Sequence, residues 1–352
     1  MVRIKNLDEF ITEGRINETG TAIRNTNPTN ELARKYKLKL NPKTGLYDCN
    51  GDVKVGKDLV QDGRLVIRFG TVKGYFGCSK NDLTTLEGAP QEVGGHFTCS
   101  NNNLTTLEGA PRKVGGHFYC DHNKLTFLKG APHEVGGHFY CSNNNLTTLE
   151  GAPQKVGGGF DCGYNNLTSL EGAPQEVGEW FDCDHSGLTS LKGAPREFGG
   201  SFNCSENVLT TLEGAPQKVG GDFYCDYNKL TSLEGAPREV GGDFYCSNNS
   251  LTSLEGAPQE VGKDFYCDHN KLTFLKGAPQ SVGGDFYCNE NDLTTLEGAP
   301  QKVGGDFDCH NNPNLTYDEA HFYSFLPDVI GGELEADDGC DYGLAQTYYK
   351  EK

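Results

Sequence analysis

A unit of 21 residues recurs along most of the chain and limits what the chain can fold into. Eleven of the 15 prolines lie in a Gly-Ala-Pro triplet, and twelve of the 14 cysteines fall at one position of the unit, from Cys78 to Cys309. Each unit LTxLxGAPxxVGGxFxCxxNx opens at one of Leu83, Leu104, Leu125, Leu146, Leu167, Leu188, Leu209, Leu230, Leu251, Leu272 and Leu293. A fixed apolar pattern of this period is typical of a solenoid, in which each unit buries its apolar face against its neighbours. We therefore predict a β-rich solenoid.

The apolar positions of one unit predict how it packs. Phe97 and Cys99 are two residues apart, so on a short strand both point inward. Asn102 is expected to turn inward at the strand end, where its amide can bond backbone groups of adjacent coils. Leu104 and Leu107 close the core. These five residues and their equivalents should be buried.

The remaining part of the unit returns the chain to the next strand. Gly88-Ala89-Pro90 is expected to cross the outer side in extended form, because proline fixes its own φ and disfavours helix at the residue before it. Gly94-Gly95 then turns into the next strand. This predicts one short strand per 21 residues, on the inner side of a curved coil.

The spacing Phe97-x-Cys99-x-x-Asn102-x-Leu104-x-x-Leu107 resembles the core of leucine-rich repeats, with Phe and Cys at two of the usual Leu positions. Residues 62–314 resemble the short bacterial type, LPxLPxxLxxLxVxxNxLxxL, which secreted effectors of enteric pathogens use. The GAP and GGxFxC segments depart from that pattern and are most similar to uncharacterised repeat proteins encoded by tailed bacteriophages. The resemblance implies a right-handed parallel coil of horseshoe or superhelical shape, and a phage-encoded protein.

Three segments follow from the repeat boundaries. Residues 1–61 form an N-terminal cap, residues 62–314 the solenoid with a degenerate first unit at 62–82, and residues 315–352 an acidic C-terminal cap. Short helices are expected at 30–37 and 317–325, and strands within 46–55. The start, KNLDEFITEG, resembles the targeting peptide of T-even-type phage head proteins, which is cut after a triplet such as Ile11-Thr12-Glu13. The alternative is a small capping helix over Leu7–Glu13.

Charge and hydropathy exclude two classes of partner. The chain has 31 Lys+Arg against 49 Asp+Glu, a net charge of −18. Sequence-independent binding to nucleic acid or to an anionic membrane needs clustered cations, so neither is expected. No apolar run approaches the ~20 residues of a membrane span, and MVRIKNLDEF lacks the apolar core of a signal peptide. We expect a protein of the bacterial host cytoplasm or of the virion.

Catalytic and metal motifs are not found in the sequence. It contains no GxSxG, HExxH, P-loop or Rossmann glycine pattern, so we expect no enzyme activity and no cofactor. No CxxC pair supports a zinc site. Parallel coils about 4.8 Å apart place equivalent Cβ atoms further apart than the ~3.5–4.5 Å of a disulfide. The cysteines are therefore expected to be reduced, small apolar core residues in a reducing compartment.

The units differ mainly at the two positions that flank Phe, which should face the inner side. The position before Phe reads His96, His117 and His138 in early units and Asp in the last five. Tyr supplies contact area and a hydrogen bond at low entropy cost. The alternative is that Tyr and Thr simply suit an exposed strand. The candidate binding residues are Asp222, Tyr224, Asp243, Tyr245, Asp264, Tyr266, Asp285, Tyr287, Trp180, Tyr119 and Tyr140.

The stacked aspartates indicate what kind of partner would fit. Like charges in register are destabilising unless something compensates them. A basic protein segment is preferred over Ca²⁺, which wants six to eight converging oxygens. The three histidines are read as a hydrated row rather than a metal or pH-sensitive strip. We expect a non-enzymatic protein-binding module; the alternative is a structural component of a virion or assembly. The oligomeric state stays open.

Overall fold

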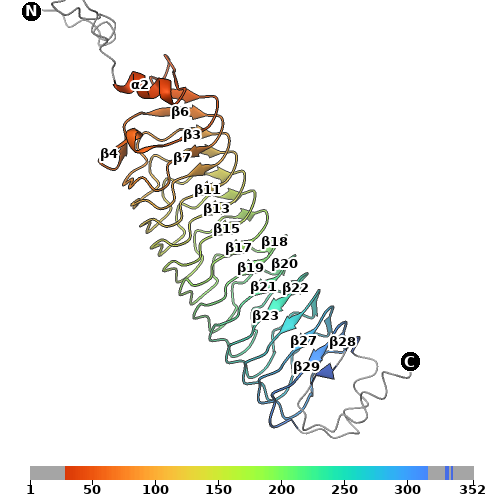
Figure 1. The fold of residues 1–352 in the computed structure, drawn as a ribbon. Helices are drawn as coiled ribbons and strands as arrows, with labels where there is room; N and C mark the ends of the chain where they lie inside the picture. The colour runs from red at the N-terminus through yellow and green to blue at the C-terminus, as the bar shows by residue number, and fades with distance from the viewer. Residues whose placement is uncertain (1–27, 316–329, 333, 336–352) are drawn as a thin grey trace, which may run out of the picture.

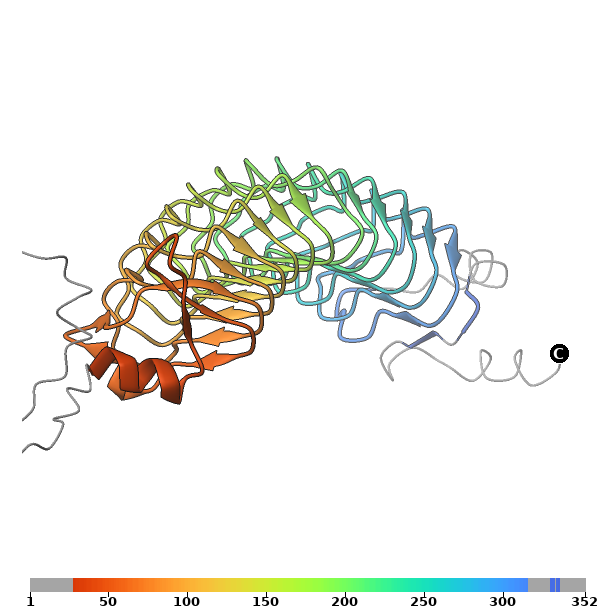
Figure 2. The ribbon, with the colours of Figure 1, turned by 90° about the horizontal axis from the view of Figure 1, so that it is seen from above.

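The computed structural model describes residues 28–315, 330–332 and 334–335, which form an elongated solenoid that bends into an arc (Figures 1 and 2). Each repeat carries two strands of two residues, such as β8 (Glu92–Val93) and β9 (Phe97–Thr98), joined through Gly94-Gly95. The expectation of one strand per unit was wrong. The Val before the glycine pair is not only a core residue but also pairs with the next coil.

Equivalent strands of successive coils pair in parallel and in register, which gives two ladders. The one that contains the Phe residues, here the Phe ladder, has 14 strands. They are β3 (Val53–Lys54), β7 (Phe76–Gly77), β9, β11 (Phe118–Tyr119), β13 (Phe139–Tyr140), β15 (Phe160–Asp161), β17 (Phe181–Asp182), β19 (Phe202–Asn203), β21 (Phe223–Tyr224), β23 (Phe244–Tyr245), β25 (Phe265–Tyr266), β27 (Phe286–Tyr287), β29 (Phe307–Asp308) and β30 (Leu334–Glu335).

The second ladder, here the Val ladder, is divided into two sheets. The first contains β2 (Tyr47–Cys49), β6 (Phe69–Val72), β8, β10 (Lys113–Val114), β12 (Glu134–Val135), β14 (Lys155–Val156) and β16 (Glu176–Val177). The second contains β18 (Glu197–Phe198), β20 (Lys218–Val219), β22 (Glu239–Val240), β24 (Glu260–Val261), β26 (Ser281–Val282) and β28 (Lys302–Val303). The division lies between β16 and β18.

The N-terminal end is closed by a helix and two short hairpins. Helix α2 spans Pro28–Lys35, close to the expected 30–37, and β1 (Lys39–Leu40) pairs antiparallel with β2. A 3-10 turn, η1 (Lys57–Leu59), leads into β4 (Val60–Gln61), which pairs antiparallel with β5 (Arg64–Leu65). The expected helices at Leu7–Glu13 and 317–325 lie outside the described residues.

Solenoid pairing extends beyond the repeats that the sequence marks. β2 and β3 pair with β6 and β7, so coil geometry begins within the segment assigned to the N-terminal cap. After the last repeat, Ile330 bridges Val303, and β30 pairs with β29. Ile330-Gly331-Gly332 and Leu334 thus take the places of Val-Gly-Gly and Phe. Each end of the repeat array is followed by a coil of weaker sequence match.

The buried positions are those that the period predicts. Phe97, Cys99, Leu104 and Leu107 are fully buried and Asn102 is 8% exposed, which confirms the expected register. The Phe rings of adjacent coils stack with centroids 5.1–5.8 Å apart from Phe76 to Phe307. A continuous column of buried rings is therefore the core of the solenoid.

The amides of the conserved-pattern Asn residues link neighbouring coils. Asn102 Nδ2 donates to the carbonyls of Cys78 and Cys99 at 3.1 and 2.9 Å. Its Oδ1 accepts from the backbone N–H groups of Asn81 and Leu83, both at 3.0 Å. The expected asparagine ladder is confirmed. Its amides satisfy buried backbone groups that a strand of two residues leaves without partners.

The cysteine thiols are buried at every coil of the ladder, as predicted. Cys99 Sγ donates to the carbonyl of Tyr119 in the next coil at 3.3 Å, and the other coils repeat this contact. Burial raises the pKa of the Cys99 thiol well above its usual range. Cys therefore fills a small core space and also supplies a weak donor, which alanine would not. Cys340 lies outside the described residues.

Two glycine positions are required by backbone geometry. Gly88 has φ +91°, and the N–H of Ala89 bonds the carbonyl of Leu86 at 2.9 Å, as in a type II turn with glycine at its third residue. The Gly-Ala-Pro triplet therefore starts in a tight turn, not in the fully extended form expected. At Gly115 a Cβ would lie 2.3 Å from the Gly94 carbonyl oxygen. The glycine pair thus permits close stacking of the coils.

Candidate partner-binding surface

The two positions that flank each Phe form one face of the solenoid. We call them the pre-Phe position (residue 96 in the coil of Phe97) and the post-Phe position (residue 98). Aromatic side chains on this face stack 4.4–4.7 Å apart, whereas buried Phe rings of successive coils are 5.1–5.8 Å apart. Coils are closer together on this face than in the core, so it lies on the inside of the curve, as expected.

At the pre-Phe position, the side chain of one coil accepts a hydrogen bond from the backbone of the next. In the His coils, which contain His96, His117 and His138, each Nδ1 is the acceptor. The His117 and His138 N–H groups donate to the preceding histidine at 2.9 and 2.8 Å, and Gly159 N–H donates to His138 at 2.6 Å. An accepting Nδ1 carries no proton, so the geometry requires neutral imidazoles.

The stacking of the imidazoles agrees with that protonation state. Ring centroids are 4.4 Å apart between His96 and His117 and 4.5 Å apart between His117 and His138. Burial, and then the neighbouring histidines, lower the pKa of His117, while Glu179 acts in the opposite direction. Glu179 Oε2 lies 3.8 Å from His138 Nδ1. The histidine row is thus part of the backbone hydrogen bonding, a role that the sequence did not reveal.

In the Asp coils a carboxylate does the same work. These coils contain Asp222, Asp243, Asp264, Asp285 and Asp306 at the pre-Phe position. The backbone N–H groups of the last four donate to Oδ1 of the preceding aspartate at 3.0, 3.0, 2.8 and 2.7 Å. The aspartates are therefore compensated in part by backbone dipoles, a compensation that the sequence argument for a basic partner did not include.

Tyrosines at the post-Phe position supply a second donor to each carboxylate. The hydroxyls of Tyr224, Tyr245, Tyr266 and Tyr287 donate to Oδ2 of the aspartate two residues earlier at 3.1, 3.4, 3.1 and 2.9 Å. Burial and the neighbouring Asp243 raise the pKa of Tyr245 to about 12, and the other three shift in the same direction. The four rings stack 4.5–4.6 Å apart. The predicted Asp/Tyr pairs thus lie together as two parallel rows.

One cation of the chain itself reaches the Asp row. Lys263 occupies the second glycine position of its coil, and its Nζ lies 4.0 Å from Asp222 Oδ1. The Lys263 side chain is 64% exposed and that of Asp222 is 24% exposed. Such an exposed contact is weak. The row therefore remains available to a stronger cationic partner.

The other predicted residues form a separate aromatic group. Tyr119 and Tyr140 stack at 4.7 Å, and the Trp180 ring lies 5.5 Å from His138 and 5.9 Å from Tyr140. Trp180 reaches these residues across Gly159, where a Cβ would lie 2.2 Å from the indole. The structure does not bring this group to the Asp coils, because three coils without tyrosine at the post-Phe position lie between.

Those three coils contain residues that the sequence analysis did not select. The central coils contain Phe160, Phe181 and Phe202, and Asp161, Asp182 and Asn203 take the tyrosine position. Burial raises the pKa of Asp161, and burial followed by the charge of Asp184 raises that of Asp182 to about 7. The signal was present as a departure from the repeat: a carboxylate where the unit has Tyr.

One rim of the face is lined by residues with left-handed backbone. The position two residues after Cys has φ between +45° and +59° in every coil from Lys80 to Asn311. Most of these residues are Asn, His or Glu, but Tyr164 and Tyr227 are aromatic and 51% and 57% exposed. The Tyr164 ring stacks on His185 at 4.2 Å. The rim therefore adds exposed aromatic surface to the inner face.

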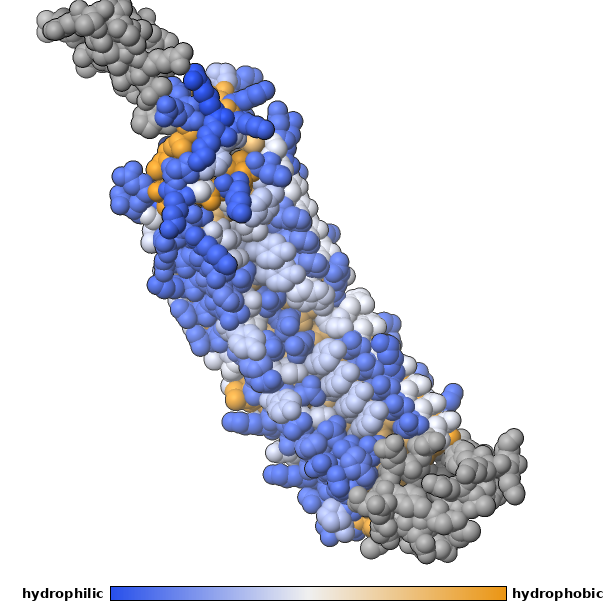
Figure 3. Space-filling view, viewed as in Figure 1, coloured by the Kyte–Doolittle hydropathy of each residue, from blue (hydrophilic) through white to orange (hydrophobic). Residues whose placement is uncertain are grey.

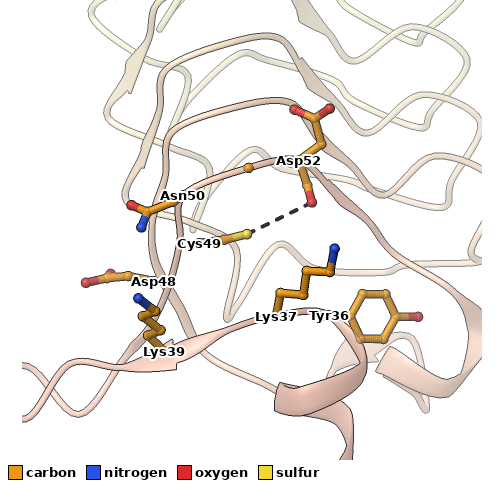
Figure 4. Close-up of a pocket in the computed structure, with 8 residues that line it drawn as sticks. Tyr36, Lys37, Lys39, Asp48, Cys49, Asn50 and Asp52 are labelled. Atoms are coloured by element: carbon orange, nitrogen blue, oxygen red, sulfur yellow. Dashed lines mark hydrogen bonds between the residues drawn. The ribbon is translucent and has the colours of Figure 1, made fainter.

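A cavity of about 310 Å³ lies between the N-terminal cap and the first coil (Figure 4). Two of its ammonium groups and two carboxylates mix both signs of charge, and the buried Cys49 thiol contacts the Asp52 carbonyl at 4.0 Å. It brings together no nucleophile and base in hydrogen-bond contact. The lining residues are Tyr36, Lys37, Lys39, Asp48, Cys49, Asn50, Gly51 and Asp52.

The surface is hydrophilic along most of the coils in the view of Figure 3, with apolar side chains gathered near the N-terminal cap. Leu40 and Val66 are the exposed aliphatic residues there. Among the described residues, no three His, Cys, Asp or Glu side chains are placed to hold a metal ion. Within the same part of the chain, no helix has the length and apolar character of a membrane span.

Comparisons with known proteins find similarity of structure only. No protein-family model and no curated protein matches the chain. The chain is similar to YopM from Yersinia enterocolitica, with 19% identity and a TM-score of 0.42 over 74% of this chain and 65% of that one. It is also similar to the functional domain of InlJ from Listeria monocytogenes, described as including a cysteine ladder, with 21% identity and a TM-score of 0.45 over 69% and 58%. The LRIM1/APL1C complex gives 14%, 0.35, 87% and 72%.

The chain thus spans less than two thirds of the length of the first two of these structures.

Proposed function

We propose that this chain is a non-enzymatic repeat module that binds a protein partner through the inner face, with a basic segment of the partner lying along the Asp coils. The observation that carries the proposal is the stack of identical Asp/Tyr pairs from Asp222 to Tyr287. Four coils of this kind extend over roughly 15 Å. That length suits an extended segment of about four or five residues.

The chemistry of the two rows supports a cationic segment. The carboxylates form a line of negative charge on a chain of net charge −18, which would accelerate the encounter with a basic partner. The tyrosine rings are already stacked at 4.5–4.6 Å, so little side-chain freedom remains to be lost on binding. Arg side chains can stack on such rings, and Lys stems can cover them.

The internal hydrogen bonds of the Asp coils also favour a second candidate function. Each carboxylate already accepts a backbone N–H and a tyrosine hydroxyl. Asp and Tyr at these positions could therefore serve the solenoid alone, as they would in a spacer of a virion or other assembly. Contacts of such a spacer would lie at its ends or on its outer side.

The proposed origin and location rest on the sequence resemblance. The GAP and GGxFxC segments resemble phage-encoded repeat proteins, so we place the protein in the bacterial host cytoplasm or the virion. The buried free thiols suit a reducing compartment. Mass spectrometry of the protein from its natural source would detect disulfides between adjacent units if this placement is wrong.

Binding kinetics on the immobilised full-length protein test the main proposal. The probe is the blocked peptide acetyl-(Gly-Arg)4-amide, with citrulline in place of arginine as its neutral control. We expect saturable binding of the arginine peptide that weakens with salt. Tyr245→Ala with Tyr266→Ala should raise the off-rate. Asp243→Asn with Asp264→Asn keeps the hydrogen-bond acceptors and should mainly slow association.

The matched control removes two carboxylates elsewhere. Glu213 and Glu234 are exposed on the turn side of coils in the same region. Glu213→Gln with Glu234→Gln should leave the kinetics unchanged. If all three double variants bind like the unmodified protein, the Asp coils are not the site. If no variant and no unmodified protein binds the arginine peptide, the spacer function takes precedence.

A further inference from the structure

The tyrosine row of the inner face is interrupted at the middle of the solenoid. Tyr140 ends the first stack and Tyr224 begins the second. Four coil steps separate them, about 19 Å at the usual strand spacing. Between them the post-Phe position holds the shorter side chains Asp161, Asp182 and Asn203. Two aromatic stacks therefore end at a stretch of lower, acidic surface, which we call the central interruption.

The regular stacking of the coils also changes at this point. The Val ladder is divided between β16 and β18. A Cβ on Gly178 would lie 2.1 Å from the Gly157 oxygen, but a Cβ on Gly199 would lie 3.9 Å from the Gly178 oxygen. The coils are thus further apart here on the Val side. Glu179 stands in this coil in place of the second glycine, and Ser186 in place of the ladder asparagine. The departures from the repeat coincide in one place.

Aromatic side chains border the central interruption on two sides. Trp180, which is half-buried, lies over Gly159 and packs toward His138 and Tyr140. Tyr164 is 51% exposed on the rim and stacks on His185. Trp and Tyr near the centre of an exposed face are the residues that most often dominate the energy of an interface. Their rings are held by neighbours, so their contact surface is preorganised.

Carboxylates form the floor. Asp161 accepts from the Ser142 hydroxyl at 2.7 Å and from Gly163 N–H at 3.1 Å, and Asp182 accepts from Asp184 N–H at 3.2 Å. Both carboxylates are half-buried, and burial raises their pKa values. A cation placed beside Asp182 would favour its ionised form. The floor is therefore complementary to positive charge and the border to a flat or apolar group.

We infer that the central interruption is the anchor point of the inner face and takes an arginine side chain that projects from a loop of the partner. A guanidinium combines the two properties that floor and border ask for, because it pairs with a carboxylate through two N–H groups and stacks on aromatic rings. An extended segment along the Asp coils would lie on the tops of the tyrosines, whereas this residue would enter between the two stacks. The inference rests on the proposed function of the inner face and names its centre.

The single tryptophan provides the measurement, because Trp180 is the one Trp in the sequence. Its fluorescence is followed in the full-length protein during titration with acetyl-Gly-Arg-Gly-amide, up to 20 mM at low salt. The Lys and citrulline analogues are the comparison peptides. We expect a saturable change of emission with the Arg peptide, several-fold weaker binding of the Lys peptide, and no saturation with citrulline. A linear response to all three would overturn the anchor.

Variants separate this inference from the proposed function. Asp182→Asn should weaken binding of the single-Arg peptide about tenfold, while Asp243→Asn and the Glu213→Gln control leave it unchanged. With acetyl-(Gly-Arg)4-amide, variants at Asp243 and Asp264 should act even when Asp182 is replaced. If Asp182→Asn and Tyr140→Ala both bind the single-Arg peptide normally, the anchor is wrong although the Asp coils remain the binding site. If neither peptide binds, both proposals fail.

Discussion

The His coils and the Asp coils have the same core and the same backbone pairing, but they differ in the side chain that accepts the N–H of the next coil. In one region the acceptor is a neutral imidazole, as in His117 to His138. In the other it is a carboxylate, as in Asp243 to Asp264. The position is fixed by backbone geometry, so the choice of side chain is free to vary charge. Two surfaces of different acid–base behaviour are thus built on one repeat.

The comparison changes how the aspartates are understood. As a row of like charges, Asp222 to Asp306 is costly. As acceptors, they receive backbone and tyrosine donors that a row of surface carboxylates would not have. Histidine at the same position accepts the backbone N–H without adding charge. The charge of the Asp coils is therefore not needed for the hydrogen bond, which is consistent with its having a separate use in binding.

The largest expected effect tests whether the two regions share one core. Phe118→Ala in the His coils and Phe244→Ala in the Asp coils each remove a fully buried ring from the Phe column. Each should lower the free energy of unfolding by about 3–5 kcal/mol. Urea unfolding of both variants beside the unmodified protein gives the measurement. Losses that differ by more than about 2 kcal/mol would mean that the cores are not equivalent.

The next effect concerns the boundary between the regions. Burial and Asp184 raise the pKa of Asp182 to about 7, and a bound cation favours the ionised carboxylate. Affinity for acetyl-Gly-Arg-Gly-amide should therefore rise between pH 6 and pH 8 and then level off, by up to about tenfold. The fluorescence titration at several pH values measures it. Asp182→Asn should flatten the profile; a profile that stays steep would assign the titration to another group.

A smaller effect separates the two acceptors directly. Because the pKa of His117 is lowered in the fold, the unfolded chain takes up the proton more readily. Stability from this group is present above the unfolded pKa, near 6.5, and is lost as the pH falls through the lower, folded pKa. Protonation also removes the Nδ1 acceptor of the His138 N–H, a bond of about 1 kcal/mol. The His coils should loosen in acid before the Asp coils do.

Hydrogen exchange detected by mass spectrometry, between pH 7.5 and 5.5 and corrected for intrinsic rates, locates that loss. Protection should fall around residues 96–159 and persist around 222–306. A triple variant with His96→Asp, His117→Asp and His138→Asp should keep its protection in acid. The charged groups facing the row include Glu179, which lies 3.8 Å from His138, so Glu179→Gln is included. Equal loss in both regions would show that the acceptor type is irrelevant.

How much of this could be read from the sequence depends on whether a feature is repeated or relational. The period alone placed Phe97, Cys99 and Leu104 in the core, because apolar spacing of a solenoid unit leaves few registers. It did not reveal the second strand at Val93, since an apolar residue beside a glycine pair looks the same whether or not its backbone is paired. The pre-Phe acceptor was also missed. It depends on an N–H of the next coil, 21 residues away.

The end coils were missed for a different reason. The segments around Val53 and Leu334 keep the spacing of the unit but replace Phe by Val or Leu and lose the Gly-Ala-Pro triplet. Searching by residue identity overlooks them, whereas searching by spacing would have found them. Likewise Asp161 and Asp182 were visible as departures from the Tyr pattern. Their buried, shared environment becomes clear only when the coils are stacked.

The smallest expected effect tests the rim, where both regions have left-handed backbone. Tyr227 in the Asp coils has φ +51° and is 57% exposed, and Asn143 in the His coils has φ +54°. Asn tolerates this conformation because its short side chain bonds locally, whereas a bulky side chain is strained. Tyr227→Asn should therefore raise the free energy of unfolding by about 0.5 kcal/mol, and Asn143→Tyr should lower it by a similar amount.

Urea midpoints of the two variants measure these shifts, and Asn248→Tyr, one coil after Tyr227, serves as the control within the Asp coils. Its φ is +55°, so it should lose as much as Asn143→Tyr does. If Tyr227→Asn is instead destabilising, the exposed ring must make contacts that outweigh the backbone strain. The rim of the two regions would then differ as their acceptors do, and Tyr227 would join the inner face as part of its binding surface.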